Sequence, residues 1–499
     1  MGDEAAVPLT IAIRGVDAGS ELWKGLARAL KDIAELIAMV HVSHGNAPWR
    51  RCVRGTALDW VGTAQVQPSL SSVSSDVLLD LHGEEIRSDG RTWRVVNIAG
   101  NCVLRPFSCL ATREAEPLVT SLYLIELDVR DAGWVVLAEA HISSRRGFRS
   151  LLDAVGRTAI WLVRAGIRAR PGMPRAWRLS IPTTQRGGSL GAVRSRIGSV
   201  RARIRDRVSS EIWAIGRVAE PVEEFVRTRT VEPQSWIEVP AREGFIADPF
   251  PWPGRDDAVL YEHFRHRTGL GSIEAMVLGG STMNGIEKLD FNVHTHLSYP
   301  FTHRSEGLVI CLLEMAAERR QAMYVLSPGE APRELCTVAE NVAMADPTLF
   351  RWGELFWIAY NDADLGLHEN LCLLFASRLE GPWLPHKLNP VKIDVRSSRP
   401  AGTVFRVGGS LIRPAQDCSD SYGCALTMNR IIECTPERYA EEPIARLLPN
   451  PNGRFPDGLH TFSVTSNGVL IDGKRTIVDW NILWQRLSRR LRRASESIR

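Results

Sequence analysis

Apolar residues follow two different periods along the chain. Between residues 1 and 170, short and continuously apolar runs alternate with stretches in which apolar residues recur three and four positions apart, a pattern typical of buried strands alternating with helices. Strands are expected at Leu9–Ile13, Val77–Leu81, Trp93–Val96 and Ser121–Leu127, and helices at Glu21–Val40 and from about Phe148 to Ala165. This alternation predicts a three-layer, Rossmann-like α/β domain over residues 1–170.

Residues 236–475 carry short apolar runs separated by glycine, proline and polar turns, which predicts many strands. The most informative feature of this region is a recurrence. The sequences IADPFPW and MADPTLF place Asp248-Pro249 and Asp346-Pro347 98 residues apart, or two spans of 49. A span of this length fits one four-stranded blade of a β-propeller.

Further blade starts fall where this period requires them, at Tyr299-Pro300, Arg399-Pro400 and His460. A polar residue follows each of the five starts at a similar distance. These residues are Glu262, Glu314, Asn361-Asp362, Gln416-Asp417 and Asp472. Five repeats of about 50 residues predict an all-β five-bladed propeller over residues 236–475.

Two arginine-rich segments flank the predicted propeller. Residues 171–235 are expected to form a helical linker, which either packs as a solvated connection or contacts phosphate or anionic lipid. Residues 476–499 place Trp480, Trp484 and Leu487 at helical spacing among arginines, which predicts a basic amphipathic helix. Such a helix can lie on an anionic membrane or dock on its own protein, and the sequence leaves both possibilities open.

The composition narrows the class of protein. With 499 residues, 44% of them hydrophobic, the chain can bury several cores, and a net charge of +4 gives no nucleic-acid footprint. The nine cysteines show no C-x-x-C spacing, so neither a disulfide framework nor a structural zinc site is expected. The start of the chain has no signal-peptide pattern and no segment is apolar enough to span a membrane, which predicts a cytoplasmic protein, peripheral at most to a membrane.

The propeller geometry gives the polar blade starts a chemical meaning. Because the first strand of every blade lines the central axis, Asp248, Asp346, Arg399 and His460 are expected to converge on one funnel. Converging carboxylates suit acid and base chemistry at a glycosidic bond, where one carboxyl protonates the leaving oxygen and another attacks the anomeric carbon or activates water. An Asp-Pro pair also caps strand starts without any function, but two pairs in register favour a site.

Several stretches carry a resemblance to known propellers, among them IADPF, HLSYPF, ADPTLFRWGELFWIAYND, LEGPWLPHKLNPV, SRPAG, RPAQDCSDSYG and GLHTFS. They resemble the five-bladed propellers of glycoside hydrolase families 43 and 32. They are more similar to the propeller region that precedes the glycosyltransferase domain in plant glucosamine inositolphosphorylceramide transferases, and to its bacterial relatives. The resemblance covers nearly half of the chain.

The resemblance implies roles for individual residues. Asp248 matches the carboxylate that the hydrolases use as base or nucleophile, and Asp346 matches the aspartate that orients the substrate and tunes the acid. The hydrolase acid lies further along the chain than Glu314, which is nevertheless the best available general acid here. The residues expected to bind substrate at the same mouth are Glu262, Arg399, Arg413, Gln416, Asp417, Tyr422 and His460.

The N-terminal stretches DVLLDLHGEE and GRTWRVVNIAGN resemble a formyltransferase-like fold but lack the catalytic motifs of that family. The first turn, AIRGVDAGS, has no G-x-G-x-x-G, so dinucleotide binding is not favoured. No cofactor is expected. His294 and His296 alternate on one strand face, but polar packing is favoured over a metal site, and no metal is expected.

These patterns favour a carbohydrate-active enzyme that cleaves or transfers a glycosyl unit in glycan or glycolipid assembly. Two alternatives stay open: a non-catalytic glycan-binding propeller that supports a glycosyltransferase complex, and a nucleotide-sugar-dependent transferase that uses the α/β domain. The expected partners are a sugar, glycan or nucleotide sugar and, through the basic helices, an anionic membrane surface.

Overall fold

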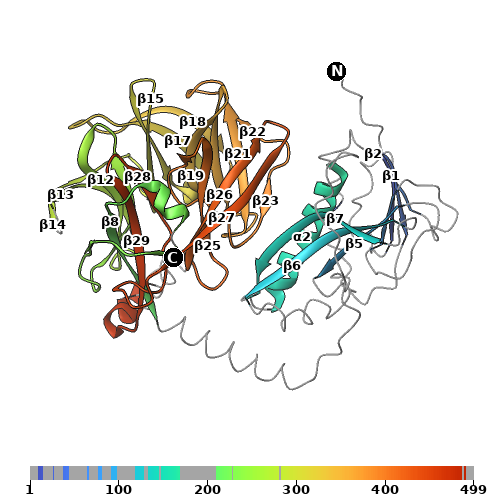
Figure 1. Cartoon of the computed structure of the whole chain (residues 1–499), viewed down its shortest axis with the longest axis horizontal. Helices are drawn as coiled ribbons and strands as arrows, with labels where there is room; N and C mark the ends of the chain where they lie inside the picture. The colour runs from blue at the N-terminus through green and yellow to red at the C-terminus, as the bar shows by residue number, and fades with distance from the viewer. Residues whose placement is uncertain are drawn as a thin grey trace, which may run out of the picture. The chain divides into compact units, whose positions relative to one another are not determined.

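A computed structural model divides the chain into two compact units, Met1–Arg194 and Ser195–Arg499 (Figure 1). The structure describes residues 9–14, 26, 37–43, 64–66, 77–80, 91–97, 118–128, 133–144, 148–168, 209–227, 229–279, 282–485 and 488–489. The basic segment between Arg168 and Ser209, and most of the last fourteen residues, therefore lie outside the described part.

In the described part of the first unit, seven strands form one sheet in the order β3-β2-β1-β4-β5-β6-β7. Its strands are β1 Leu9–Arg14, β2 Ile37–Ser43, β3 Ala64–Val66, β4 Val77–Asp80, β5 Arg91–Asn97, β6 Val119–Asp128 and β7 Gly133–Ser143. Strands β1 to β5 pair in parallel, and β6 is antiparallel to both β5 and β7. Helix α2, Phe148–Arg168, packs on β6 and β7.

The expected strands lie in β1, β4, β5 and β6, and the expected second helix is α2. The expected helix Glu21–Val40 is wrong at its end, because Ile37–Val40 belongs to β2. This run of four apolar residues suits a buried strand as well as a helix, and its parallel pairing with β1 decides for the strand. The described part of this unit is mostly β-sheet, and the Rossmann-like or formyltransferase-like assignment stays a prediction.

Within the described part of the second unit, five sheets of four or five strands follow one another around a β-propeller (Figure 1). The first blade has β11 Gly244–Trp252, β12 Arg255–Arg265, β13 Leu270–Gly279 and β14 Thr282–Lys288; the second has β15 Ser298–Ser305, β16 Leu308–Glu314, β17 Arg320–Val325 and β18 Arg333–Glu340. The third has β19 Met344–Trp352, β20 Leu355–Asp362, β21 Asn370–Ala376, β22 Leu384–Pro385 and β23 Lys392–Ile393. The fourth has β24 Phe405–Val407, β25 Ser410–Asp417, β26 Ala425–Cys434, β27 Tyr439–Pro449 and β9 Thr230–Val231.

The fifth blade joins the two ends of the propeller. Its inner strands β28, Phe462–Thr465, and β29, Gly468–Ile477, are continued by β8, Ser210–Val218, and β10, Ser235–Ile237. Strand β8 pairs with β29 over its whole length, and Ile215 of β8 packs in one apolar cluster with Leu470 of β29 and Ile246 of the first blade.

Strand β8 differs from what the sequence predicts, because residues 210–218 were expected in a helical linker. Most residues of β8, SEIWAIGRV, are buried, because neighbouring blades cover both faces of the strand. A strand that is buried on both faces does not need the regular alternation of apolar and polar residues by which strands are recognised in a sequence. The arginine-rich composition around β8 therefore hid a buried strand. The propeller begins near Ser210 rather than at Trp236.

The chain leaves β29 at Ile477 and becomes helical at residues 480–485 and 488–489. Asp479 caps this helix by accepting hydrogen bonds from the N–H groups of Asn481 and Ile482. Ile482 is fully buried, and the Gln485 side chain donates to the carbonyl of Arg242 at 3.3 Å. Among the described helices, none has the length and apolar character that crossing a membrane requires.

Candidate functional site

Three blades begin with the same unusual backbone. Asp248, Tyr299 and Asp346, each followed by proline, adopt φ values of 52°, 49° and 50°. At each of these positions the pairing of the inner strand with its neighbour is interrupted by a bulge. Positive φ is uncommon for residues other than glycine and its strain concentrates at functional sites. All three side chains are buried at the starts of inner strands, around the propeller axis, and this group with the residues that contact it is called the funnel below.

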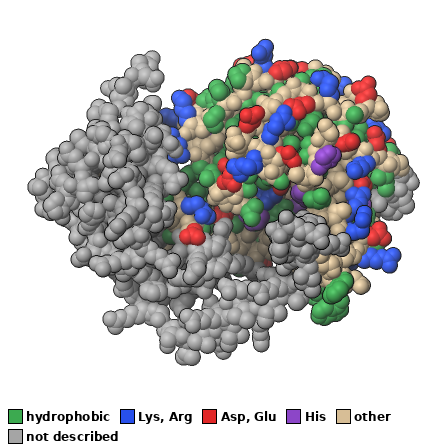
Figure 2. Space-filling view, turned by 180° about the vertical axis from the view of Figure 1, so that it is seen from behind, with side chains coloured by type: hydrophobic (Ala, Val, Ile, Leu, Met, Phe, Trp, Pro, Cys, Tyr) green, Lys and Arg blue, Asp and Glu red, His purple; other side chains and the backbone are tan. Residues whose placement is uncertain are grey.

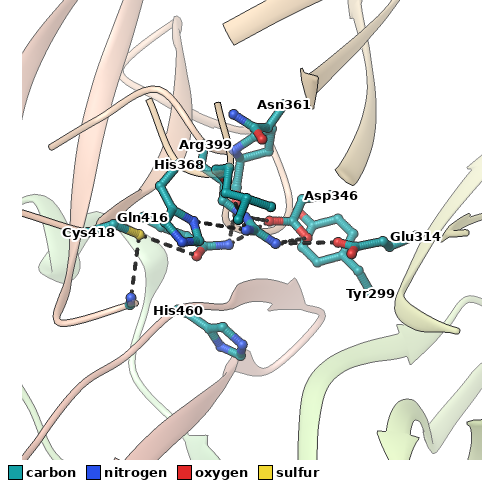
Figure 3. A network of polar contacts seen from close by, with 12 residues as sticks. Tyr299, Glu314, Asp346, Asn361, His368, Arg399, Gln416, Cys418 and His460 are labelled. Carbon is teal, nitrogen blue, oxygen red and sulfur yellow. Dashed lines mark hydrogen bonds and ion pairs between the residues drawn. The ribbon is translucent and has the colours of Figure 1, made fainter. Parts of the chain in front are cut away.

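Asp346 lies at the centre of a charged network (Figure 3). Arg399 donates to it from Nε at 2.5 Å and from Nη2 at 3.3 Å, and Gln416 donates from Nε2 at 2.6 Å. Glu314 lies against the same guanidinium, 3.3 Å from Nη2. The structure thus brings together Glu314, Asp346, Arg399 and Gln416, as the sequence predicts.

Arg399 uses all five of its N–H groups within the protein. Besides Asp346 and Glu314, its Nη1 donates to the carbonyl of Leu367 at 3.1 Å and to His368 Nδ1 at 3.0 Å. We expected this guanidinium to help hold a polar or anionic group of the substrate, but its donors already bind protein partners. Its role in this arrangement is to balance and orient the two carboxyls.

A second network surrounds Asp248. Its carboxylate accepts hydrogen bonds from Thr461 Oγ1 at 2.7 Å and from the backbone N–H of Tyr299 at 3.2 Å. His460 Nε2 lies 3.6 Å from the same carboxylate, while His460 Nδ1 lies 2.5 Å from Asp472. Asp472 also accepts the backbone N–H groups of Asp248, His460 and Thr461, so it fixes the orientation of the histidine.

The carboxyls of the funnel differ in their protonation. Burial and the nearby carboxylates of Asp472 and Asp346 raise the pKa of Asp248 to about 6, although His460 opposes the shift. Burial, reinforced by Asp346, raises the pKa of Glu314 well above its ordinary value. Burial also disfavours ionisation of Asp346, but Arg399 holds the pKa of Asp346 below its ordinary value. The funnel therefore contains one carboxylate and one carboxylic acid beside the same guanidinium.

Glu262, expected to bind substrate, is buried near these groups. Burial and the carboxylates of Asp248 and Glu314 raise its pKa well above the ordinary value. Its Oε1 has no hydrogen-bond partner in the described structure, and His296 Nε2 lies 3.7 Å away. The surroundings of Glu262 thus favour its protonated form, as those of Glu314 do.

Aromatic rings form one wall of the site. The ring of His460 stacks on Trp213 with centroids 3.9 Å apart, and Tyr422 meets both rings edge-on. The guanidinium carbon of Arg399 lies 5.1 Å from the centre of the Tyr422 ring. Tyr422 and His460 therefore lie where the sequence predicts, and Tyr422 is only half-buried, so it can face a ligand.

Arg413 and Asp417 do not lie in the funnel, contrary to our expectation. Side chains alternate along β25, so both point to the opposite face from Gln416. Arg413 is fully buried and its guanidinium donates to Glu441 at 2.6 and 2.8 Å and to the carbonyls of residues 397 and 398. Asp417 pairs with Arg446 at 2.8 Å. Both charges are structural parts of the fourth blade.

Asp248, His460 and Asp472 are the three described residues whose ligand atoms, all within 4.8 Å of one another, could together hold a metal ion. The carboxylate oxygens of the two aspartates already accept the hydrogen bonds given above, and His460 lies against both carboxylates. Contacts within the protein therefore hold these three residues together. His294 and His296 belong to no such group in the described part of the chain. His296 Nδ1 instead accepts the N–H of Gly271 at 2.8 Å.

Four further residues of the site were not among the expected site residues: Trp213, His368, Thr461 and Asp472. Thr461 follows His460 directly, and Asp472 occupies the polar position shared by the five blades, so the repeat contained a signal for both. Trp213 lies in β8 and His368 in the loop after β20, where no repeat position marks them.

Comparison with solved structures finds propeller glycosidases. Zg3597, a family 117 glycoside hydrolase from Zobellia galactanivorans, is 12% identical and covers 54% of this chain and 90% of its own, with a TM-score of 0.33. An α-L-arabinofuranosidase from Lactobacillus brevis is 13% identical, covers 47% and 84%, and has a TM-score of 0.32. At these scores the similarity carries no statement about activity.

Comparison with curated sequences finds glucosamine inositolphosphorylceramide transferase 1 of Oryza sativa and of Arabidopsis thaliana, each 28% identical over about two fifths of this chain. The matched region spans 28% and 27% of the length of those relatives. Residues 208–454 also match the family described as glucosamine inositolphosphorylceramide transferase 1, N-terminal. The resemblance expected from the sequence motifs is therefore confirmed: over residues 208–454, the β-propeller resembles the N-terminal region of glucosamine inositolphosphorylceramide transferase 1.

Proposed function

We propose that the chain is a carbohydrate-active enzyme that cleaves or transfers a glycosyl unit in the propeller funnel. The observation that carries this proposal is the pairing of a carboxylic acid, Glu314, with carboxylates at Asp346 and, above pH 6, Asp248. Glycosyl chemistry needs such a division between an acid and a base or nucleophile. The transferase named by the relatives acts on a sugar, which supports the same substrate class.

Each carboxyl receives one role. Glu314 gives its proton to the oxygen that leaves the anomeric carbon. Asp248 either attacks that carbon or removes a proton from the incoming water or acceptor hydroxyl, while His460 stabilises the Asp248 carboxylate. Asp346, held by Arg399 and Gln416, orients the substrate and keeps Glu314 protonated. Tyr422 provides an apolar ring face for the sugar.

The test measures turnover of activated glycosides and of nucleotide sugars by the full chain and by Asp248→Asn and Glu314→Gln. We expect each variant to lose turnover by about 100-fold or more, because general acid and base catalysis each contribute on that scale. Asp417→Asn is the matched control, since it removes a buried aspartate on the other face of β25. Full turnover in either funnel variant would refute these roles.

Two other functions remain as outcomes of the same experiment. Glycan binding without turnover, lost in Tyr422→Ala, would identify a binding propeller, an interpretation favoured by the contacts through which Arg399 engages both Asp346 and Glu314. Turnover that needs a nucleotide sugar and survives Asp248→Asn would place the chemistry in residues 1–170. A cytoplasmic location is also part of the proposal, and cell fractionation tests it.

A further inference from the structure

The end of the propeller at which the inner strands begin carries exposed apolar residues. Among the large hydrophobic side chains of the described residues, Trp480 and Trp484 are the most exposed, at 76% and 68%. Val478 beside them is 57% exposed, and so is Leu367, with Leu365 at 43%. Single exposed apolar residues are common on protein surfaces. Two tryptophans one helical turn apart lie on the same side of the helix and form an apolar patch, and leaving such a patch in water is unfavourable.

These residues share one end of the propeller because of the blade topology. The funnel residues lie at the starts of the inner strands and the ends of the second strands, as Asp346 in β19 and Glu314 in β16 show. The loop after β20, which holds Leu365 and Leu367, leaves from the end of a second strand. The C-terminal helix follows β29, which is also a second strand.

Contacts place both sets at the end of the propeller where the inner strands begin. The carbonyl of Leu367 accepts a hydrogen bond from Arg399 inside the funnel. On the C-terminal helix, Gln485 binds the carbonyl of Arg242, just before the inner strand β11. The helix is held by its buried Ile482, so the two exposed tryptophans are fixed in place and point away from the protein. Figure 2 shows a hydrophobic knob at the lower right edge, where the C-terminal helix of Figure 1 lies after the half turn.

The charge of the segment that follows the patch in sequence indicates the kind of partner. Residues 486–499 contain six arginines, Arg486, Arg489, Arg490, Arg492, Arg493 and Arg499, against one acidic side chain, Glu496. Tryptophan side chains favour the boundary between lipid headgroups and acyl chains, and clustered arginines favour anionic headgroups. A protein partner would need a complementary acidic surface with an apolar centre, whereas an anionic membrane supplies both properties together.

We infer that the mouth end of the propeller, through Trp480, Trp484, Leu365 and Leu367, binds the surface of an anionic phospholipid membrane. In this orientation the funnel faces the lipid headgroups. A headgroup-linked hydroxyl could then reach the carboxyls as glycosyl acceptor or donor, a consequence that rests on the proposed function. Binding itself requires only the surface.

The experiment is vesicle flotation of the full chain with phosphatidylcholine vesicles with and without phosphatidylserine. We expect binding only when phosphatidylserine is present, weakening as salt screens the arginines. Trp480→Ser with Trp484→Ser should reduce binding about tenfold or more, because two interfacial anchors are lost. Leu365→Ser with Leu367→Ser should reduce it less.

The matched control is Leu384→Ser with Ile432→Ser. These side chains are about half exposed, like Leu367, but lie towards the other end of the blades, in β22 and β26. This variant should bind as the unaltered chain does.

Absence of binding to every vesicle, undiminished binding of the tryptophan variant, or an equal loss in the control would refute the inference. If the unaltered chain does not bind vesicles but associates with itself, and the tryptophan variant is monomeric, the partner of this surface is a second copy of the chain. Because flotation requires no turnover, its failure and the failure of the funnel chemistry are distinguishable.

Discussion

The protonation of the funnel carboxyls depends on how closely the Arg399 guanidinium binds each of them. Asp346 receives three side-chain hydrogen bonds from Arg399 and Gln416 and stays ionised, whereas Glu314, which shares the guanidinium, is held protonated. Buried carboxyls beside one cation do not both ionise at small cost, so the protons of such a pair leave in separate steps. Substitution of either residue therefore changes the state of the other.

The pH dependence of turnover follows from these states. Asp248 must be ionised to act, and its pKa is raised to about 6, so kcat/KM should rise as the pH passes about 6. Glu314 must be protonated, and its pKa is raised, so kcat/KM should fall at higher pH. The resulting profile is bell-shaped. A pH series measured with any accepted substrate tests it, and Glu314→Gln should abolish the falling limb; a flat profile would contradict the assignment.

Glu262 offers a test through stability. Its pKa is raised in the folded state, so its contribution to stability is complete below the unfolded pKa and is lost as the pH rises through the folded pKa. Between those values the loss is about 1.4 kcal/mol per pH unit at most. Glu262→Gln should thus make the unfolding free energy fall less between pH 5 and pH 8 than it does in the unaltered chain. Urea unfolding at both pH values measures the change, and an unaltered decline would exclude a buried, protonated Glu262.

At the scale of the elements, bulged inner strands connect neighbouring blades. Tyr299, at the start of β15, shares its hydroxyl with Thr348 of β19 at 2.8 Å and accepts the N–H of Gly402 at 2.5 Å. Its own N–H binds Asp248 of β11. One residue at a strained φ thereby joins four blade segments, which keeps the carboxyls in fixed positions.

Tyr299→Phe isolates the contribution of that hydroxyl. The ring still fills its buried site, but the buried Gly402 N–H loses its acceptor, which costs about 1–3 kcal/mol. We expect the midpoint of urea unfolding to fall correspondingly. Tyr324→Phe, whose ring is also buried but lies in β17 of the same blade, provides a comparison away from the inner strand. Equal stability of Tyr299→Phe and the unaltered chain would show that the hydroxyl does not connect the blades.

At the scale of the whole molecule, the ring is closed by a strand that precedes the first blade. Strand β8 supplies the third strand of the last blade and packs against the first. A ring closed by both ends of its sequence has no free edge at the junction, which protects it from pairing with other chains.

Two truncated chains test this closure. A chain that begins at residue 195 retains the whole second unit and should show a single cooperative unfolding transition. A chain that begins at residue 219 lacks β8 and leaves β29 unpaired on one side, so it should be aggregated or unfold at much lower temperature. Circular dichroism with thermal unfolding distinguishes the two, and equal stability would show that β8 is dispensable.

The sequence by itself determined the propeller and most of its funnel. The period of about 49 residues reflects one blade, and because each blade presents its first strand to the axis, Asp248, Asp346, Arg399 and His460 were predicted to converge. The same logic predicted Glu314, Gln416 and Glu262, which lie on the second strands. Local pattern sufficed here because repetition converts sequence position into spatial position.

Only the tertiary structure decided the remaining features. The sequence could not show that Arg413 and Asp417 point to the opposite face of β25, since that depends on register, nor that Arg399 binds two carboxyls instead of a ligand. Nor could it show that residues 210–218 form a strand, because β8 is stabilised by pairing with β29, which lies about 250 residues later in the sequence. Contacts between distant segments depend on register and closure of the ring, and neither is encoded in the local period of apolar residues.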